Sequence, residues 1–161
     1  MMRLVLVPAL VMALVMALAV PVRADFDDGA AAAIKGDFAT ALAEFRPLAE
    51  AGHPKAQNNL GIMYQYGRGV AGDLAEAQRW YRKAAEQGLA EAHFNLGVLY
   101  MEGEGGTRDL VQAYLWLSLA AQVGDKSAGD GLTRLGGEMT ADQIAEARRL
   151  LGQWRARHGG E

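Results

Sequence analysis

The sequence predicts an all-α fold, a short α-solenoid of about three helical hairpins with a C-terminal capping helix. The first observation is a repeat, because the segment LGIMYQYGRGV at residues 60–70 returns at residues 96–106 as LGVLYMEGEGG. The second is that apolar residues within each copy recur at steps of three and four, which places them on one helix face. The two copies are 36 residues apart. A fixed period of this length is typical of stacked hairpins, in which each unit buries its apolar stripe against its neighbours.

The first segment, residues 1–24, has the pattern of a secretory signal peptide. A basic start is followed by the apolar run Leu4–Val20, and small or β-branched residues precede a cut after Ala24. The alternative is an uncleaved membrane anchor, although this run is short for a span of about 30 Å. We expect cleavage, a periplasmic or secreted protein, and no membrane contact after the cut. Loss of Arg3 and Arg23 would change the net charge from −3 to −5.

Composition narrows the class of protein further. The chain is mildly acidic and has no basic block, so it is a poor candidate for binding nucleic acid, where neutralised phosphates supply the affinity. It has no cysteine, which excludes a disulfide scaffold and an N-terminally acylated lipoprotein. The residues after the leader suit one domain held together by apolar packing.

A hairpin over residues 25–53 opens the expected stack. Its first helix is predicted over Phe26–Ile34, followed by a tight turn at Gly36 and Asp37. The second helix carries small and aromatic residues in the register of the later repeats. The loop between its two helices is shorter than the loops of the two hairpins that follow.

Two full repeats are expected over residues 54–89 and 90–125. Aligned at the 36-residue offset, they share twelve identical positions without a gap. In the first copy these are Ala56, Leu60, Gly61, Tyr64, Gly67, Gly69, Asp73, Ala77, Trp80, Ala84, Ala85 and Gly88. The small residues Gly61 and Gly97 would let two helix backbones approach closely, with Trp80 and Trp116 filling the volume beside them.

Each repeat contains its own helix start and stop signals. The Gly-x-Gly loop permits positive φ and ends the first helix. Asp73 and Asp109 stand at the N-cap of the second helix, and Gly88 and Gly124 end it.

Residues 126–161 are expected to form a partial repeat and the capping helix. The last helix begins with a capping box at Thr140 and Gln143. Its apolar residues fall on one face, which would close the stack, while arginines lie largely off that face. The apolar set is Ile144, Ala147, Leu151 and Trp154.

The motif WYRKAAEQG at residues 80–88, with the Leu-Gly and Gly-x-Gly elements before it, resembles the Sel1-like repeat family, a relative of the tetratricopeptide repeat. The second copy departs from the family pattern at Gly106 and at the Leu117-Ser118-Leu119 segment. The resemblance covers about residues 26–135. It implies a right-handed solenoid whose first helices line a concave surface, and an adaptor for another protein. Similar exported bacterial proteins act as regulators or scaffolds in envelope and exopolysaccharide systems.

The residues that could carry catalysis or bind a metal are few. Ser118 and Ser127 have no motif that supplies a base, and the histidines do not form a metal-ligand spacing. We interpret His53 and His93 as polar groups of the surface or groove. The glycine loops follow helices rather than strands, unlike phosphate-binding loops. The sequence therefore predicts no enzyme, no cofactor and no metal site.

The resemblance places a partner-binding groove on the first helices of the two full repeats. By analogy with tetratricopeptide repeats its residues are Lys55, Asn58, Asn59, Ile62, Gln65, Glu91, Phe94, Asn95, Val98 and Met101. The amides could pair with a peptide backbone, and the apolar members form a strip. Packing of Ile62 and Val98 against neighbouring helices is an equally open interpretation. We expect a protein or peptide partner; the alternatives are a small-ligand or cell-wall hydrolase accessory protein and an oligomerising scaffold.

Overall fold

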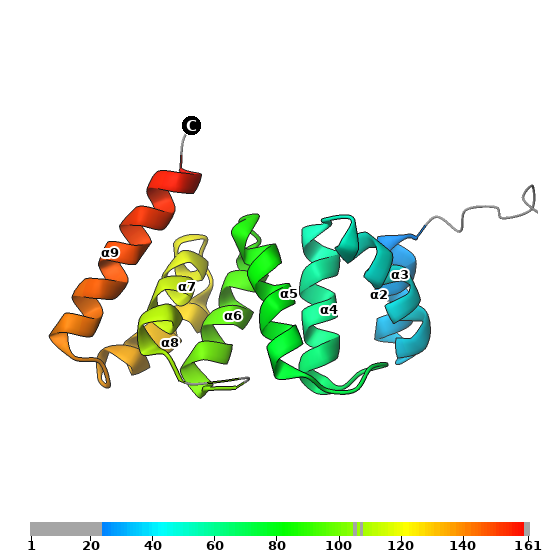
Figure 1. Ribbon diagram of the computed structural model, residues 1–161, viewed down its shortest axis with the longest axis horizontal. Coiled ribbons are helices and arrows are strands. Elements are labelled where there is room, and N and C mark those ends of the chain that lie inside the picture. Colours follow the sequence, from blue (N-terminus) through cyan, green and yellow to red (C-terminus); the bar gives the residue numbers. More distant parts are fainter. Residues whose placement is uncertain (1–23, 105, 107, 160–161) are drawn as a thin grey trace, which may run out of the picture.

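The computed structural model describes residues 24–104, 106 and 108–159, and all regular structure in this part of the chain is helical (Figure 1). The helices are α2 (Phe26–Ile34), α3 (Phe38–Glu50), α4 (Pro54–Tyr66), α5 (Leu74–Glu86), α6 (Ala90–Glu102), α7 (Leu110–Gln122), α8 (Lys126–Gly136) and α9 (Ala141–His158). The signal peptide predicted from the sequence, and Gly105 of the second Gly-x-Gly loop, lie outside the described residues.

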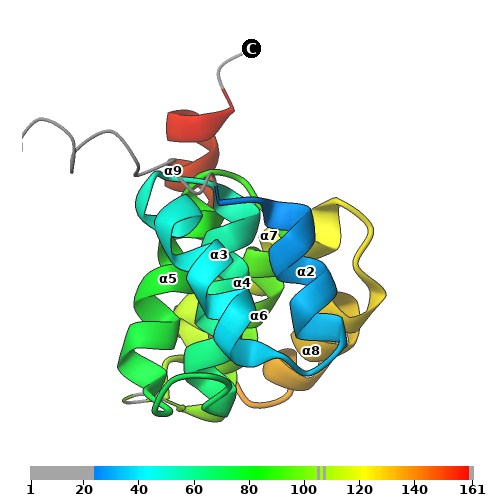
Figure 2. The same cartoon turned by 90° about the vertical axis from the view of Figure 1, so that its right-hand side faces the viewer.

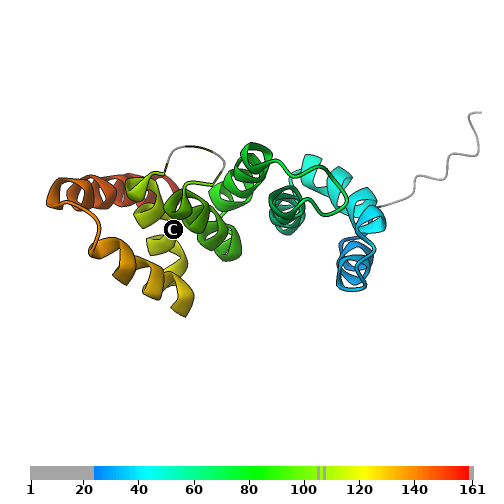
Figure 3. The same ribbon diagram turned by 90° about the horizontal axis from the view of Figure 1, so that it is seen from below.

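The helices form three antiparallel hairpins in a row, α2–α3, α4–α5 and α6–α7, followed by α8 and α9 (Figure 1). From α2 to α8 consecutive helices pack against one another, whereas α9 reaches back to pack against α7. Seen end-on, α2 and α8 lie on one side of the molecule and α3 and α5 on the other (Figure 2). From below, α2 and α8 project toward the same side of the row (Figure 3). The predicted α-solenoid with a terminal capping helix is confirmed.

The local signals in the sequence place the helix boundaries. The Asp73 carboxylate accepts hydrogen bonds from the backbone N–H groups of Ala75 and Glu76, each at 3.0 Å, and so caps α5. Asp109 caps α7 in the same way. Gly67 has a φ of +63°, a left-handed conformation that ends α4. These bonds satisfy backbone groups that a helix end leaves unpaired.

The capping helix α9 starts with the expected reciprocal pair. The Gln143 N–H donates to the Thr140 hydroxyl at 3.2 Å, and the Thr140 N–H donates to the Gln143 side chain at 2.9 Å. Ala147 and Leu151 of α9 are buried. The preceding helix α8 has a weaker composition, because it holds Gly129 and Gly131 in its interior.

Two glycines set the distance between the helices of a repeat. A Cβ on Gly61 would lie 2.6 Å from Cδ1 of Tyr81, and a Cβ on Gly97 would lie 2.7 Å from Cγ of Leu117. The side chains pressed against the glycines are therefore Tyr81 and Leu117, each one residue after the tryptophan expected there. Tyr81 is fully buried, and its hydroxyl donates to Oε1 of Gln65 at 2.6 Å.

Candidate functional site

We define the first-helix face as the surface formed by α2, α4, α6 and α8. All ten residues predicted for the groove belong to α4 or α6. Two apolar hollows open on this face, one of about 230 Å³ between α2 and α4 and one of about 280 Å³ between α6 and α8. Five of the ten predicted residues line these hollows: Asn59 and Ile62 the first, and Phe94, Val98 and Met101 the second.

The first hollow ends at an exposed patch of apolar and aromatic side chains. Ile34 lies on its rim and is 87% exposed, an unusual state for a large aliphatic residue. The Arg68 guanidinium lies 5.5 Å from the ring centroid of Phe38 and 5.1 Å from that of Tyr66. These cation–π contacts hold a positive charge beside the hollow.

The second hollow is lined by α6 on one side and α8 on the other. Gly131 of α8 lacks a side chain here, so the hollow reaches Leu117 of α7 beneath it. Arg134 lines its edge and forms an ion pair with Glu102. Met101 is 6% exposed and belongs to the packed core under this hollow more than to its surface.

The predicted amides divide into those that form hydrogen bonds between helices of the protein and Asn59, which lines a hollow. Nδ2 of Asn95 donates to Oδ1 of Asn58 at 2.9 Å, which joins α6 to α4, and Asn58 is buried. Gln65 accepts from Tyr81 and donates to the Glu104 carboxylate at 3.1 Å. These bonds explain why amides occupy helix interiors without invoking a partner. Asn59 alone among the amides lines a hollow, while Lys55 and Glu91 are exposed. A partner-binding role for these residues stays a prediction.

The interpretation of His93 as a surface or groove group is wrong. It is 4% exposed, and its Nε2 lies 2.9 Å from the carbonyl oxygen of Ala85, the distance of a hydrogen bond. Its ring stacks on Trp116 and meets Trp154 edge-on, with centroids 5.7 and 5.5 Å apart. Burial lowers the pKa of the His93 imidazole.

The position equivalent to His93 in the preceding repeat explains this burial. Gln57 occupies it, and Nε2 of Gln57 donates to the carbonyl oxygen of Ala49 at 3.1 Å. Both side chains therefore bind a carbonyl in the last turn of the preceding helix, which also accepts the backbone N–H of the glycine that follows that helix. His53, by contrast, is half-buried, and its Nδ1 accepts the N–H of Ala56 as the cap of α4.

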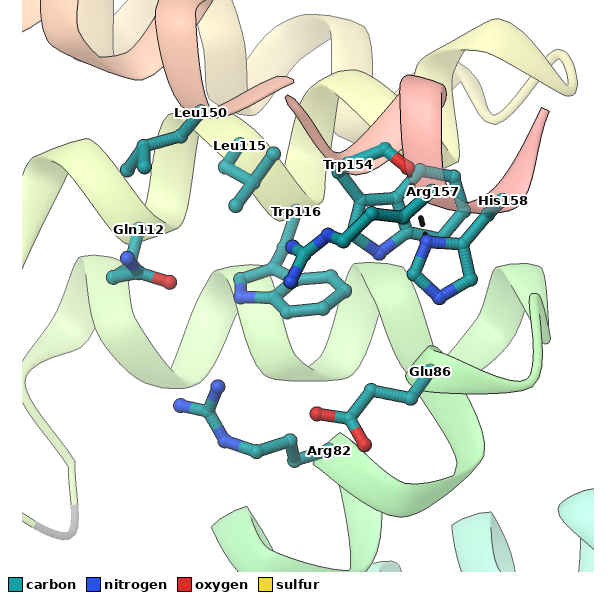
Figure 4. A pocket seen from close by; sticks show the side chains of 9 residues that line it. All are labelled: Arg82, Glu86, Gln112, Leu115, Trp116, Leu150, Trp154, Arg157 and His158. Carbon is teal, nitrogen blue, oxygen red and sulfur yellow. Dashed lines mark hydrogen bonds between the residues drawn. The ribbon is translucent and has the colours of Figure 1, made fainter. Parts of the chain in front are cut away.

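A further cavity, of about 540 Å³, lies on the opposite side of the array between α5, α7 and α9 (Figure 4). Trp116 of α7 lies at its centre, between side chains of α5 and α9. Sequence reasoning missed this site, because the docking of α9 on α7 has no counterpart in the repeat pattern. The available signal was that Leu115 and Leu119 flank Trp116 where Arg79 and Lys83 flank Trp80 in the first copy.

Among the described residues, no three side chains of the types that bind metals gather into a possible metal site. None of the described helices combines the length and the apolar composition needed to cross a bilayer.

Stacked α-hairpins with conserved spacing define a helical-repeat protein, and comparison with known proteins identifies the repeat. The family model of the Sel1 repeat matches residues 54–89 and 90–125. The chain therefore contains two Sel1 repeats, a type of repeat that suggests a scaffold for protein–protein interaction.

Solved structures support the same identification. The chain superposes with a TM-score of 0.76 and 34% identity on a protective antigen present in uropathogenic Escherichia coli strains, described as displaying an SLR fold; the match covers 80% of this chain and 28% of that one. A Sel1 repeat protein from Oxalobacter formigenes gives a TM-score of 0.67 at 29% identity, over 81% and 56% of the two chains. The chain thus spans less than two thirds of the length of either of these proteins. No curated protein matches it.

Proposed function

We propose that this protein is a non-catalytic, exported adaptor that holds a segment of a partner protein on its first-helix face, with a role in envelope or exopolysaccharide regulation. The observation that carries the proposal is the pair of apolar hollows on that one face. Each hollow is large enough for one or two apolar side chains. A bound helix or extended segment could place one anchor in each, which is a common mode of peptide recognition.

The charges beside the hollows favour particular flanking residues in the partner. Arg68 borders the first hollow and Arg134 the second, although Arg134 is already paired with Glu102. An acidic residue next to the first apolar anchor would therefore meet an accessible cation. We expect a partner segment with two apolar anchors and an acidic residue beside the one that enters the first hollow.

Photo-crosslinking from single positions tests the face directly. A photoreactive residue is placed at Ile34 or Ser127, exposed residues that line the two hollows, and at Arg79, an exposed position on α5. We expect the same protein to be captured from envelope extract at the first two positions and not at the third. Capture at Arg79 alone would contradict the assignment of the face.

A matched pair of substitutions then tests the first hollow. Ile34→Asp places a charge on its rim, and Val123→Asp makes the same kind of change at another exposed aliphatic residue, 66% exposed. Neither change removes a buried side chain, so circular dichroism should show equal helicity. We expect only Ile34→Asp to lose the captured partner. Equal retention by both variants would argue against this hollow as the contact.

Export is the second component of the proposal, and one contact supports the cut after Ala24. The backbone N–H of Asp25 donates to Oε2 of Glu44 at 2.8 Å, and the Asp25 side chain caps α2. Cleavage would turn that N–H into an ammonium group beside the Glu44 carboxylate, adding an ion pair where a hydrogen bond stands. The intact mass of the protein from the periplasm tests this: we expect residues 25–161, and a full-length mass would refute the cut.

A further inference from the structure

The cavity between α5, α7 and α9 lies on the side of the array away from the first-helix face, and its lining is chemically mixed. Its volume of about 540 Å³ is within the range of small-ligand sites, about 300–1,000 Å³. Its apolar part consists of the indole rings of Trp116 and Trp154 with two leucines, Leu115 and Leu150 (Figure 4). The polar part comes from Arg82 and Glu86 of α5, from Gln112 of α7 and from the last turn of α9.

Comparison of the two repeats shows what is particular about Trp116. The equivalent Trp80 is covered by cations of its own helix: Nζ of Lys83 lies 4.1 Å from a ring centroid of Trp80, and Cζ of Arg79 lies 5.2 Å from it. The residues equivalent to Arg79 and Lys83 in the next repeat are Leu115 and Leu119. Trp116 therefore lacks cations on its own helix.

The cations near Trp116 come instead from the two flanking helices. Arg82 of α5 lies on one side of the cavity and Arg157 of α9 on the other (Figure 4). Arg82 is held in place because its guanidinium donates to the Tyr100 hydroxyl. With Glu86 as the single carboxylate of the lining, the two arginines leave a net positive charge in a protein whose net charge is −3.

The hydrogen-bonding groups of the lining are mostly donors. The indole Nε1 atoms of Trp116 and Trp154 are buried and have no acceptor among the described residues. Trp80 shares this state, so an unpaired indole alone does not mark a site. What differs at Trp116 is the combination of indoles, two arginines on opposite sides, and open volume between them.

We propose that this cavity binds an organic anion, an aromatic or aliphatic body that carries a carboxylate. The apolar body would lie against Trp116 and Trp154, and the carboxylate would accept hydrogen bonds from Arg82 or Arg157. Arginine guanidinium groups bind carboxylates strongly because their N–H fork matches the two oxygens. The same chemistry is offered by a free carboxylic acid and by the C-terminal residue of a peptide.

The indole N–H resonances of the protein provide the test, since the chain has three tryptophans and Trp80 lies outside the cavity. The purified protein is titrated with N-acetyl-phenylalanine and, separately, with its amide, while indole signals are followed by two-dimensional NMR. We expect saturable shifts of the Trp116 and Trp154 signals with the acid, about tenfold weaker binding of the amide, and an unmoved Trp80 signal. Equal binding of acid and amide, or no shift with the acid, would overturn the proposal.

Two substitutions and a peptide arm complete the experiment. Arg157→Gln should weaken binding of the acid about tenfold, whereas Lys83→Gln, which removes a cation from Trp80, should leave it unchanged. Far-ultraviolet circular dichroism, compared with the native protein, shows that each variant is folded. Acetyl-Gly-Gly-Phe with a free or amidated C-terminus distinguishes the sources: binding of the free form supports a peptide end, and binding of the small acid alone supports a free carboxylate. An unaffected Arg157→Gln variant would refute the assigned anion contact.

Discussion

Nδ2 of Asn95 donates a hydrogen bond to Oδ1 of Asn58 at 2.9 Å and so links the first helices of two successive repeats. The two residues are not equivalent in the repeat, because Asn95 corresponds to Asn59 and Asn58 to Phe94. The bond therefore crosses from one repeat to the next with an offset of one residue.

This bond predicts an energetic coupling between Asn58 and Asn95. Because Asn58 is buried, removal of either partner leaves the other amide unsatisfied, at a cost of about 1–3 kcal/mol. The variants Asn58→Ala and Asn95→Ala, alone and together, should show a coupling of about 1 kcal/mol in urea denaturation. Additive effects of the two substitutions would show that the bond contributes nothing to stability.

The close packing on Gly61 predicts opposite effects of alanine at two glycines. Gly61→Ala should destabilise the protein by about 1–3 kcal/mol, because its Cβ would overlap the Tyr81 ring. Gly129→Ala adds a Cβ that meets nothing within 4 Å, and should stabilise it by up to about 1 kcal/mol through helix propensity. Midpoints of thermal unfolding measure both. A stabilising Gly61→Ala would mean that the helices separate easily.

Burial of His93 predicts a pH-dependent stability. Its pKa in the folded protein lies below the ordinary value of 6.5, chiefly because of burial. The unfolded chain therefore binds the proton more tightly, and stability should fall as pH drops below 6.5 until the folded pKa is reached. At pH 7.5 the imidazole is neutral in both states, and this contribution does not vary.

His93→Gln is the matched variant, because Gln57 makes the equivalent bond to a carbonyl in the preceding repeat. It keeps a donor for Ala85 and removes the titrating group. Urea denaturation at pH 7.5 and pH 5 should show a smaller loss of stability for the variant than for the native protein. Equal losses in both proteins would assign the pH dependence to other groups.

Tyr81 should resist ionisation in the folded state. Burial raises the pKa of its hydroxyl well above the ordinary value of 10.0, and the hydroxyl donates to Gln65. In an alkaline titration followed by ultraviolet absorbance, Tyr81→Phe should remove a tyrosinate signal only at pH values where the native protein unfolds. Loss of a signal near pH 10 would show that water reaches this hydroxyl.

Local signals in the sequence were enough to predict the hairpins and their boundaries. Asp73 caps its helix with bonds that span two and three residues, and the bonds of the Thr140–Gln143 pair span three. The 36-residue period then implied stacking, because hairpins with open apolar stripes need neighbours. These parts of the fold depend on short-range chemistry, which a single sequence displays.

The candidate sites could be predicted only in part, because they depend on which helix covers which residue. Phe94 and Val98 are half-buried and line a hollow, and their contact with a partner stays a prediction. His93 stacks on Trp116 inside its repeat but also meets Trp154 of α9, a helix outside the repeat. The cavity around Trp116 is likewise lined in part by α9. No periodicity in the sequence specifies where a capping helix docks.

The position of α9 has a consequence for how the protein opens locally. Since α9 packs against α7, its attachment does not depend on α8 alone, and α8 buries only Ala128 and Leu135. With two interior glycines, α8 is the helix whose backbone amides should exchange with deuterium fastest among α4 to α9. The backbone amides of α9 should then exchange more slowly than those of α8. Local unfolding would therefore begin at the penultimate helix, α8, while the last helix, α9, stays packed on α7.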